Sequence, residues 1–194
     1  MCVQILIIGP RHSGKSECAR ALAKITGGIA VDLDKLVESQ SGKTPRELYE
    51  SSPGSFMEAE AEALASVIMA PGQNDAVCHR ENLSLEIVST GGGLVDNARA
   101  MALLSKAKSL NRRIAAVYLD VSADTAWNRI ADAAAKEGFP PFLKTGNPKE
   151  SHLVLHRRRA DACKAFADFT VSAENKTSME IAAEITDWLN RVRF

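Results

Sequence analysis

A short segment near the amino end constrains this chain more than any other part of it. Residues 9–16 read Gly-Pro-Arg-His-Ser-Gly-Lys-Ser, which has the spacing G-x-x-x-x-G-K-[S/T]. In loops of this kind backbone N–H groups surround nucleotide phosphates, the lysine reaches the outer phosphates and the hydroxyl residue takes magnesium. Residues 3–8 before it form a β-branched apolar run, and residues 17–24 after it have helical composition. Because a strand that enters a helix through such a loop aims the helix N-terminus at an anion, the sequence predicts nucleotide binding and not a bare surface turn.

The candidate nucleotide contacts are the loop residues and the first residue after them. They are Gly9, Arg11, His12, Ser13, Gly14, Lys15, Ser16 and Glu17, with Lys15 also a catalytic candidate. His12 stands where many such loops have glycine, because the backbone there can need a positive φ, which histidine tolerates at moderate cost. Two roles stay open for its imidazole: a contact with a nucleotide oxygen, or a solvated loop side chain.

Composition excludes several classes of protein. The chain has 194 residues, with 24 basic and 24 acidic side chains. That length suits one domain with a substantial core, and the charge balance argues against a nucleic-acid partner. Four scattered cysteines without C-x-x-C spacing predict reduced thiols. With no apolar run of membrane-spanning length and no leader before the loop, we expect a cytoplasmic protein without a membrane partner, and we take a monomer as the working expectation.

Apolar runs and helical segments alternate along the whole chain. Strands are predicted at 3–8, 29–32, 85–90, 113–121 and 169–171, and the main helices at 17–24, 56–69, 96–108, 123–137, 152–167 and 178–192. Strands that alternate with helices predict an α/β fold with a five-stranded parallel sheet covered on both faces, which is a three-layer α/β/α arrangement.

The second predicted strand ends in Asp32-Leu33-Asp34, a segment with two acids. Ligands gather at the carboxyl ends of parallel strands, so both acids are expected to face a nucleotide bound at the first loop. Magnesium needs oxygen ligands, and a hydroxyl nucleophile needs a carboxylate to hold or accept its proton. The alternative is that Asp34 only caps the helix that follows.

Three further segments carry polar or backbone groups at positions suited to a ligand. Gly91, Gly92 and Gly93 follow a strand, where their backbone N–H groups can approach a ligand closely. Residues 138–148 form a long loop dense in proline and glycine, as active-site lids often do. Residues 156–159 read His-Arg-Arg-Arg, which predicts a solvated helix face, with room for one member to point at a phosphate or carboxylate.

The order of these features resembles the shikimate kinase family over nearly the whole chain. The shared features are the phosphate loop, Asp-x-Asp at 32–34, Phe56-x-x-x-Glu60, Ser-Thr-Gly-Gly-Gly at 89–93, Val-Tyr-Leu-Asp-Val at 117–121, the proline lid and Ala-Asp-Phe-Thr-Val at 167–171. The resemblance implies a nucleoside-monophosphate-kinase-like P-loop fold in one domain, 1–194, with a substrate region at about 33–62 and a lid at about 136–150. It also implies transfer of the γ-phosphoryl group of ATP, with Mg²⁺, to the 3-hydroxyl of shikimate.

The resemblance also implies a role for each matching residue. Asp34 would bind the shikimate hydroxyls and orient or deprotonate the attacking one. Gly91, Gly92 and Gly93 would offer N–H groups, and Arg159 would pair with the substrate carboxylate. Ser16 and Asp32 would serve the metal. These roles suit phosphoryl transfer, which depends on positioning and charge neutralisation.

Two positions depart from the family pattern. The family usually has arginine directly after the aromatic residue that matches Phe56, where it grips the substrate carboxylate, and this chain has Met57. A charge-assisted contact worth about 1.5–3 kcal/mol is then absent. The family lid usually reads Arg-Pro-Leu-Leu, whereas residues 140–143 read Pro-Pro-Phe-Leu. The candidates to replace the lid arginine are Lys136, Lys144 and Lys149.

Three functions are therefore weighed. The leading one is an ATP-dependent kinase for shikimate. The second keeps the chemistry and changes the acceptor to another polyol, such as gluconate, or to a nucleoside monophosphate. The third is a nucleotide-binding protein that has lost catalysis. The acids beside the expected phosphates favour an enzyme, and the two missing arginines favour the third possibility.

Overall fold

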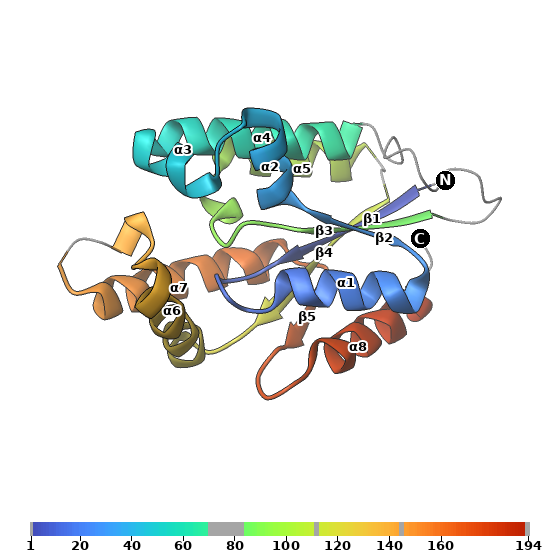
Figure 1. Ribbon diagram of the computed structural model, residues 1–194. Coiled ribbons are helices and arrows are strands. Elements are labelled where there is room, and N and C mark those ends of the chain that lie inside the picture. Colours follow the sequence, from blue (N-terminus) through green and yellow to red (C-terminus); the bar gives the residue numbers. More distant parts are fainter. Residues whose placement is uncertain (1, 70–83, 111–112, 144–145, 193–194) are drawn as a thin grey trace.

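Five strands form one parallel sheet at the centre of the molecule. The computed structural model in Figure 1 describes residues 2–69, 84–110, 113–143 and 146–192. The strands are β1 (Cys2–Ile8), β2 (Ile29–Asp32), β3 (Ser84–Ser89), β4 (Ile114–Asp120) and β5 (Phe169–Ser172). They are ordered β2-β3-β1-β4-β5, and every neighbouring pair is parallel. The predicted α/β fold with five parallel strands is confirmed.

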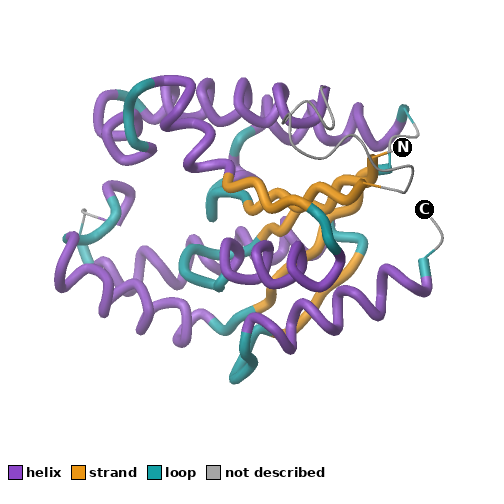
Figure 2. The backbone as a smooth tube through the Cα atoms, turned by 45° about the vertical axis from the view of Figure 1, so that its right-hand side comes forward, coloured by secondary structure: helices purple, strands orange, loops and turns teal. Residues whose placement is uncertain are grey.

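Helices cover both faces of the sheet (Figures 1 and 2). One face packs against α1 (Lys15–Thr26) and α8 (Ser178–Arg191). The other packs against α2 (Leu33–Ser41), α4 (Pro53–Met69), α5 (Ala98–Ser109) and α7 (Pro148–Phe166). Shorter or peripheral elements are α3 (Pro45–Ser51), α6 (Ala123–Glu137) and the 3₁₀ turns η1 (Leu94–Asp96) and η2 (Pro141–Leu143). Each face thus has its own apolar core, with β1 buried between the two.

The central strand shows why the sheet forms where the sequence predicts it. In β1, Leu6 and Ile8 point into the core beneath α4 and α5, while Ile5 and Ile7 point into the core beneath α1 and α8. Because β1 is buried on both faces, neither face is in contact with water, and its side chains form a continuous apolar run. The loop after β1 therefore leaves the sheet from its middle, between β3 and β4.

Two helices begin three or more residues earlier than predicted. We expected a helix from residue 152, but α7 begins at Pro148, because the Asn147 side chain caps it by accepting from the backbone N–H groups of Lys149 and Glu150. Proline fits the first helical turn, where its missing N–H has no partner to lose. Similarly, Pro53 opens α4, three residues before the predicted start.

Some predictions concern residues outside those that the structure describes. Most of the connection between the predicted helix at 56–69 and the predicted strand at 85–90 lies outside the described residues, and so does Cys78. The other three cysteines are free thiols. Among the described residues, the search for helices with the length and hydropathy of a membrane span finds none.

Candidate active site

The loop after β1 has positive φ angles at two of its glycines. Gly9 has a φ of 149°, and a Cβ there would lie 2.9 Å from the carbonyl oxygen of Leu119. Gly14 has a φ of 90° and directly precedes α1. His12 has a φ of 58°, so the positive φ expected at this position is confirmed. A loop with these dihedral angles curls back over the N-terminus of α1, where backbone N–H groups have no helical partner.

Lys15 lies buried inside this loop. Its ammonium group donates a hydrogen bond to the carbonyl oxygen of Pro10 at 2.7 Å. Burial lowers its pKa from the usual 10.5 to about 8, and the nearby charge of Asp34 opposes that shift. The side chain is therefore still mostly cationic at neutral pH, as a ligand for phosphate oxygens must be.

The side chains of Arg11, His12 and Glu17 lie nearer to solvent, whereas Ser13 is only 2% exposed. Arg11 donates from Nε to the ring of His12 at 3.4 Å, and Arg129 of α6 donates to the His12 carbonyl oxygen at 3.0 Å. Glu17 forms an exposed ion pair with Arg20 at 3.3 Å. The side chain of Glu17 is thus directed along the helix surface, and any nucleotide contact from this residue would come from its backbone.

Ser16 and Asp32 meet across two elements. The Ser16 hydroxyl donates to Oδ2 of Asp32 at 2.7 Å, which joins the first turn of α1 to the end of β2. Oδ1 of Asp32 accepts from the backbone N–H of Lys35 at 3.4 Å, so Asp32 is the residue that caps α2. The alternative that assigned this cap to Asp34 is wrong, because α2 already includes Asp34 in its first turn.

Asp34 is directed toward the glycine turn after β3. A Cβ added to Gly91 would lie 3.3 Å from Oδ1 of Asp34 and 2.7 Å from Oε1 of Glu60. Burial raises the pKa of Asp34, the charge of Asp32 raises it further, and Lys15 and Arg11 oppose the rise. A carboxylate with a raised pKa, next to a cationic phosphate loop, is suited to take a proton from a hydroxyl.

The next two glycines of the turn also approach other chain segments closely. A Cβ on Gly92 would lie 2.7 Å from the backbone nitrogen of Arg11. A Cβ on Gly93 would lie 3.0 Å from Nη2 of Arg159. The absence of side chains thus lets the turn reach the phosphate loop on one side and α7 on the other.

These residues line one cavity of about 440 Å³. It is bounded by the phosphate loop, the glycine turn, α3 and the lid. The lining residues are Arg11, Asp34, Glu38, Thr44, Pro45, Arg46, Tyr49, Phe56, Gly91, Gly92, Gly93, Gly138, Pro140, Pro141, Phe142 and Arg159. The structure therefore brings together Asp34, the three glycines and Arg159, to which the family resemblance gave roles in one acceptor site.

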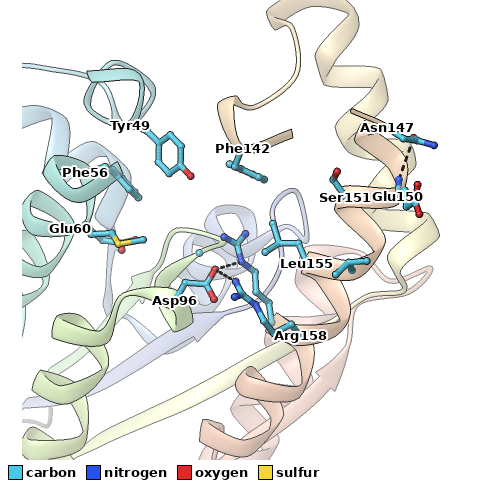
Figure 3. A pocket seen from close by; sticks show the side chains of 14 residues that line it. Tyr49, Phe56, Glu60, Asp96, Phe142, Asn147, Glu150, Ser151, Leu155 and Arg158 are labelled. Atoms are coloured by element: carbon cyan, nitrogen blue, oxygen red, sulfur yellow. Dashed lines mark hydrogen bonds and ion pairs between the residues drawn. The ribbon is translucent and has the colours of Figure 1, made fainter. Parts of the chain in front are cut away.

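A second cavity, of about 750 Å³, also has Arg159 in its lining and is drawn in Figure 3. There Arg159 donates from Nε to Oδ2 of Asp96 at 2.8 Å, and Arg158 donates to the same oxygen at 2.8 Å. Sequence reasoning missed Asp96. Of the basic run predicted as a solvated face, Arg157 and Arg158 are exposed, whereas Arg159 is largely buried and His156 is buried.

Glu60 is a second acid that sequence reasoning left without a role. It is only 1% exposed, and its Oε2 accepts a hydrogen bond from Nδ2 of Asn97 at 2.9 Å. Burial raises its pKa from 4.5 to about 7, and the Asn97 hydrogen bond opposes the rise. The signal was present in the sequence, because Glu60 falls on the same helical stripe as Phe56 and Leu64, where an apolar residue belongs.

An arginine from another helix, α3, contacts the lid. Arg46 of α3 donates from Nη2 to the carbonyl oxygen of Phe139 at 2.9 Å, and the Phe139 ring stacks on Trp127 of α6 with centroids 5.6 Å apart. Lys136 and Lys149 are exposed and line neither cavity, and Lys144 lies outside the described residues. Among the described residues, Arg46 contacts the lid at Phe139 and Arg159 contacts it at the Phe142 ring, 5.4 Å from the ring centroid.

The chain was compared with known proteins. A family profile described as shikimate kinase matches residues 11–190. The chain is 29% identical to a shikimate kinase of Corynebacterium diphtheriae, with 97% of this chain and 95% of that protein covered. It is 30% identical to a shikimate kinase of a Sulfurihydrogenibium species, with 96% and 98% covered.

A solved structure shows the same fold. Shikimate kinase from Acinetobacter baumannii in complex with shikimate superposes with a TM-score of 0.78 at 20% identity, over 100% of this chain and 97% of that one. The family profile, the relatives that span nearly the full chain and the shared architecture agree. The chain belongs to the shikimate kinase family of ATP-dependent phosphotransferases.

Proposed function

We propose that the protein transfers the γ-phosphoryl group of ATP to the 3-hydroxyl of shikimate, a step in the synthesis of aromatic amino acids. The observation that supports this most is the position of Asp34. Its carboxylate lies beside the glycine turn and near the cationic phosphate loop, in a cavity that Arg159 also lines. One cavity thus offers a base for a hydroxyl and a cation for a carboxylate, and shikimate carries both groups.

The nucleotide would bind at the loop between β1 and α1. Backbone N–H groups of residues 9–16 would surround its phosphates, and Lys15 would leave the Pro10 carbonyl oxygen to reach them. Ser16 and Asp32 present two oxygens that suit Mg²⁺, which prefers hard oxygen ligands. When bound, the ion neutralises charge on the phosphate oxygens.

The acceptor would lie between α2, α3, the glycine turn and the lid, with its carboxylate at Arg159, which lines this cavity and the larger one. Asp34 would orient the attacking hydroxyl and take its proton, so that the oxygen attacks the γ-phosphorus while ADP leaves. Gly91, Gly92 and Gly93 would offer N–H groups to the substrate, and Arg159 would pair with the carboxylate. Arg11 and Lys15 would balance the negative charge that spreads over the phosphoryl oxygens.

Met57 is the observation that favours a second acceptor. It lines the larger cavity at the position where the family has an arginine, so the pocket is wider and less basic than the family pattern implies. Another polyol, such as gluconate, or a nucleoside monophosphate could then be the acceptor. Loss of catalysis is the third possibility, since the arginine is also missing from the lid sequence.

A coupled assay of ADP release separates these possibilities. The protein is tested with ATP, Mg²⁺ and each of shikimate, gluconate and the nucleoside monophosphates, with Lys15→Ala as the control. Turnover with shikimate and none with the others supports the proposal. Turnover with another acceptor supports the second function, and ATP binding without transfer to any acceptor supports the third.

We also infer that one chain suffices for activity. All groups assigned to the nucleotide and the acceptor come from the same chain, within one sheet and its flanking helices. The substrate region at about 33–62 and the lid at about 136–150 then act as parts of this single unit. Light scattering during turnover tests the monomer, and activity confined to a dimer would contradict it.

A further inference from the structure

The arginine expected to hold the acceptor carboxylate does not act alone. Arg159 and Arg158 both donate to Oδ2 of Asp96 at 2.8 Å, and Figure 3 draws Asp96 and Arg158 next to each other in the larger cavity. An Arg159–Asp96 pair by itself has no net charge, so it would attract an anion only weakly. The second arginine gives the group of three a net charge of +1.

The rest of the larger cavity is acidic. The charged residues that line it are Glu60, Asp96, Glu150, Arg158 and Arg159. Without Arg158, one cation would face three acids at this end of the pocket. Coulomb repulsion would then oppose the entry of a carboxylate, and most strongly when Glu60 is ionised.

Position 57, where the family has an arginine and this chain has Met57, lies in the same cavity. Met57 on α4 and Arg158 on α7 both line it, together with Arg159. An arginine at position 57 would have reached the carboxylate from the α4 side. In this chain the corresponding charge comes from the opposite side, on α7, where Asp96 fixes its direction.

We propose that Arg158 is a specificity-determining residue that supplies the second positive charge for the acceptor carboxylate, in place of the arginine absent at position 57. The inference rests on the proposed function, because it takes a carboxylate-bearing acceptor as given. Arg159 makes the inner contact and is only 16% exposed, while Arg158 makes the outer one and is 64% exposed. Asp96 positions the two guanidinium groups side by side.

The test compares Arg158→Ala with Arg157→Ala in shikimate binding and turnover. Arg157 is a matched control, because it is the exposed preceding residue of the same helix and lines neither cavity. We expect Arg158→Ala to weaken shikimate binding and raise its KM by about threefold to tenfold, since an exposed charge is partly screened by solvent. Neither the KM for ATP nor kcat should change by more than about twofold, and Arg157→Ala should resemble the parent in both.

Three further measurements distinguish a charge effect from a structural one. The loss in Arg158→Ala should shrink as salt is added, because screening weakens the contact in the parent protein. It should disappear for the methyl ester of shikimate, which carries no negative charge. Arg158→Lys should recover part of the affinity, and Met57→Arg in the Arg158→Ala background should recover it from the α4 side.

The outcomes test the role of Arg158 separately from the proposed function. Equal shikimate affinity in Arg158→Ala and Arg157→Ala would overturn the role of Arg158 and leave the proposed function standing. An equal loss for shikimate and its methyl ester would also overturn it, since that loss would not depend on the carboxylate. If the parent protein binds shikimate in calorimetry without turnover, the proposed function fails while the binding comparison still tests Arg158. Absence of both binding and turnover would overturn both.

Discussion

Asn97 holds one carboxylate oxygen of Glu60 at 2.9 Å, while the other, Oε1, has no hydrogen-bond partner among the residues that the structure describes. Asn97 is also the N-cap of α5, so its side chain joins the start of that helix to the buried face of α4. A buried acid with one satisfied oxygen is costly to ionise. The raised pKa of Glu60, about 7, follows from this arrangement.

Stability should therefore decrease with pH through the range set by Glu60. Below pH 4.5 the carboxyl is protonated in both the folded and the unfolded chain. Between pH 4.5 and about 7 the folded protein keeps a proton that the unfolded chain has lost, so the free energy of unfolding falls as pH rises. Glu60→Gln should remove this dependence and stabilise the protein at pH 8 by on the order of 3 kcal/mol relative to the parent.

Urea unfolding at pH 5 and pH 8 measures this effect. Glu62→Gln is the matched control, because Glu62 is an exposed acid on the same helix. The difference between parent and Glu60→Gln should grow from pH 5 to pH 8, whereas Glu62→Gln should track the parent. A constant difference at both pH values would show that Glu60 does not titrate in this range.

Asp34→Asn should separate chemistry from nucleotide binding. The amide keeps the size of the side chain but cannot accept the hydroxyl proton, so turnover should fall by about 10²- to 10⁴-fold. ATP affinity should stay within about twofold, because the phosphates are held by the loop between β1 and α1. Steady-state kinetics and titration with a fluorescent ATP analogue give the two values, and a parallel loss of both would place Asp34 at the metal.

Arg46→Ala should loosen the lid. Without the hydrogen bond from Nη2 to the Phe139 carbonyl oxygen, the Phe139 ring should leave Trp127 and expose the indole to water. In a Trp188→Phe background Trp127 is the only tryptophan, and its emission should move to longer wavelength. Because such a hydrogen bond contributes about 0.5–1.5 kcal/mol, kcat/KM for shikimate should fall by up to about tenfold.

Arg99→Ala in the same background is the control for this lid prediction. Arg99 is also an ion-paired arginine, but its partner is Glu58 at 3.0 Å, on the outer surface of α4 and α5. Its loss should change neither emission nor kinetics. An unchanged spectrum in Arg46→Ala would mean that other contacts hold the lid.

Gly92→Ala should disturb both substrate regions at once. The new methyl group would lie 2.7 Å from the backbone nitrogen of Arg11, so either the glycine turn or the phosphate loop must move. We expect a loss of about 1–3 kcal/mol of stability, typical of overpacking, together with weaker nucleotide binding. Gly54→Ala, whose methyl group would lie 3.5 Å from the Ser52 side chain, is the tolerated control in thermal unfolding.

Sequence alone predicted the features that local patterns determine. The phosphate loop, the five strands and the acids after β2 follow from spacing, apolar runs and strand ends, and the structure places them as expected. Contacts between distant segments were not predictable in this way. Asp96 and Arg158 are 62 residues apart, and Arg46 and Phe139 are 93 apart, so each pair is created by the packing of helices around the sheet.

The two departures from the family pattern were misleading for the same reason, because contacts between distant segments cannot be seen in the sequence. Met57 and the lid sequence suggested that two positive charges were lost, because sequence comparison looks for a charge at the same position in the chain. In three dimensions a cation need only reach the same cavity. Arg158 lines the same cavity as Met57, from α7, and Arg46 of α3 lines the acceptor cavity next to the lid.

The two oxygens of Asp32 have separate tasks, since Oδ1 caps α2 and Oδ2 accepts from Ser16. Replacing this aspartate with alanine removes both at once, so an inactive alanine variant would say nothing about which was needed. Replacing it with asparagine exchanges a single atom and keeps an oxygen for the cap. At this position the choice of substitution decides whether an experiment reports on the helix cap or on the proposed metal contact.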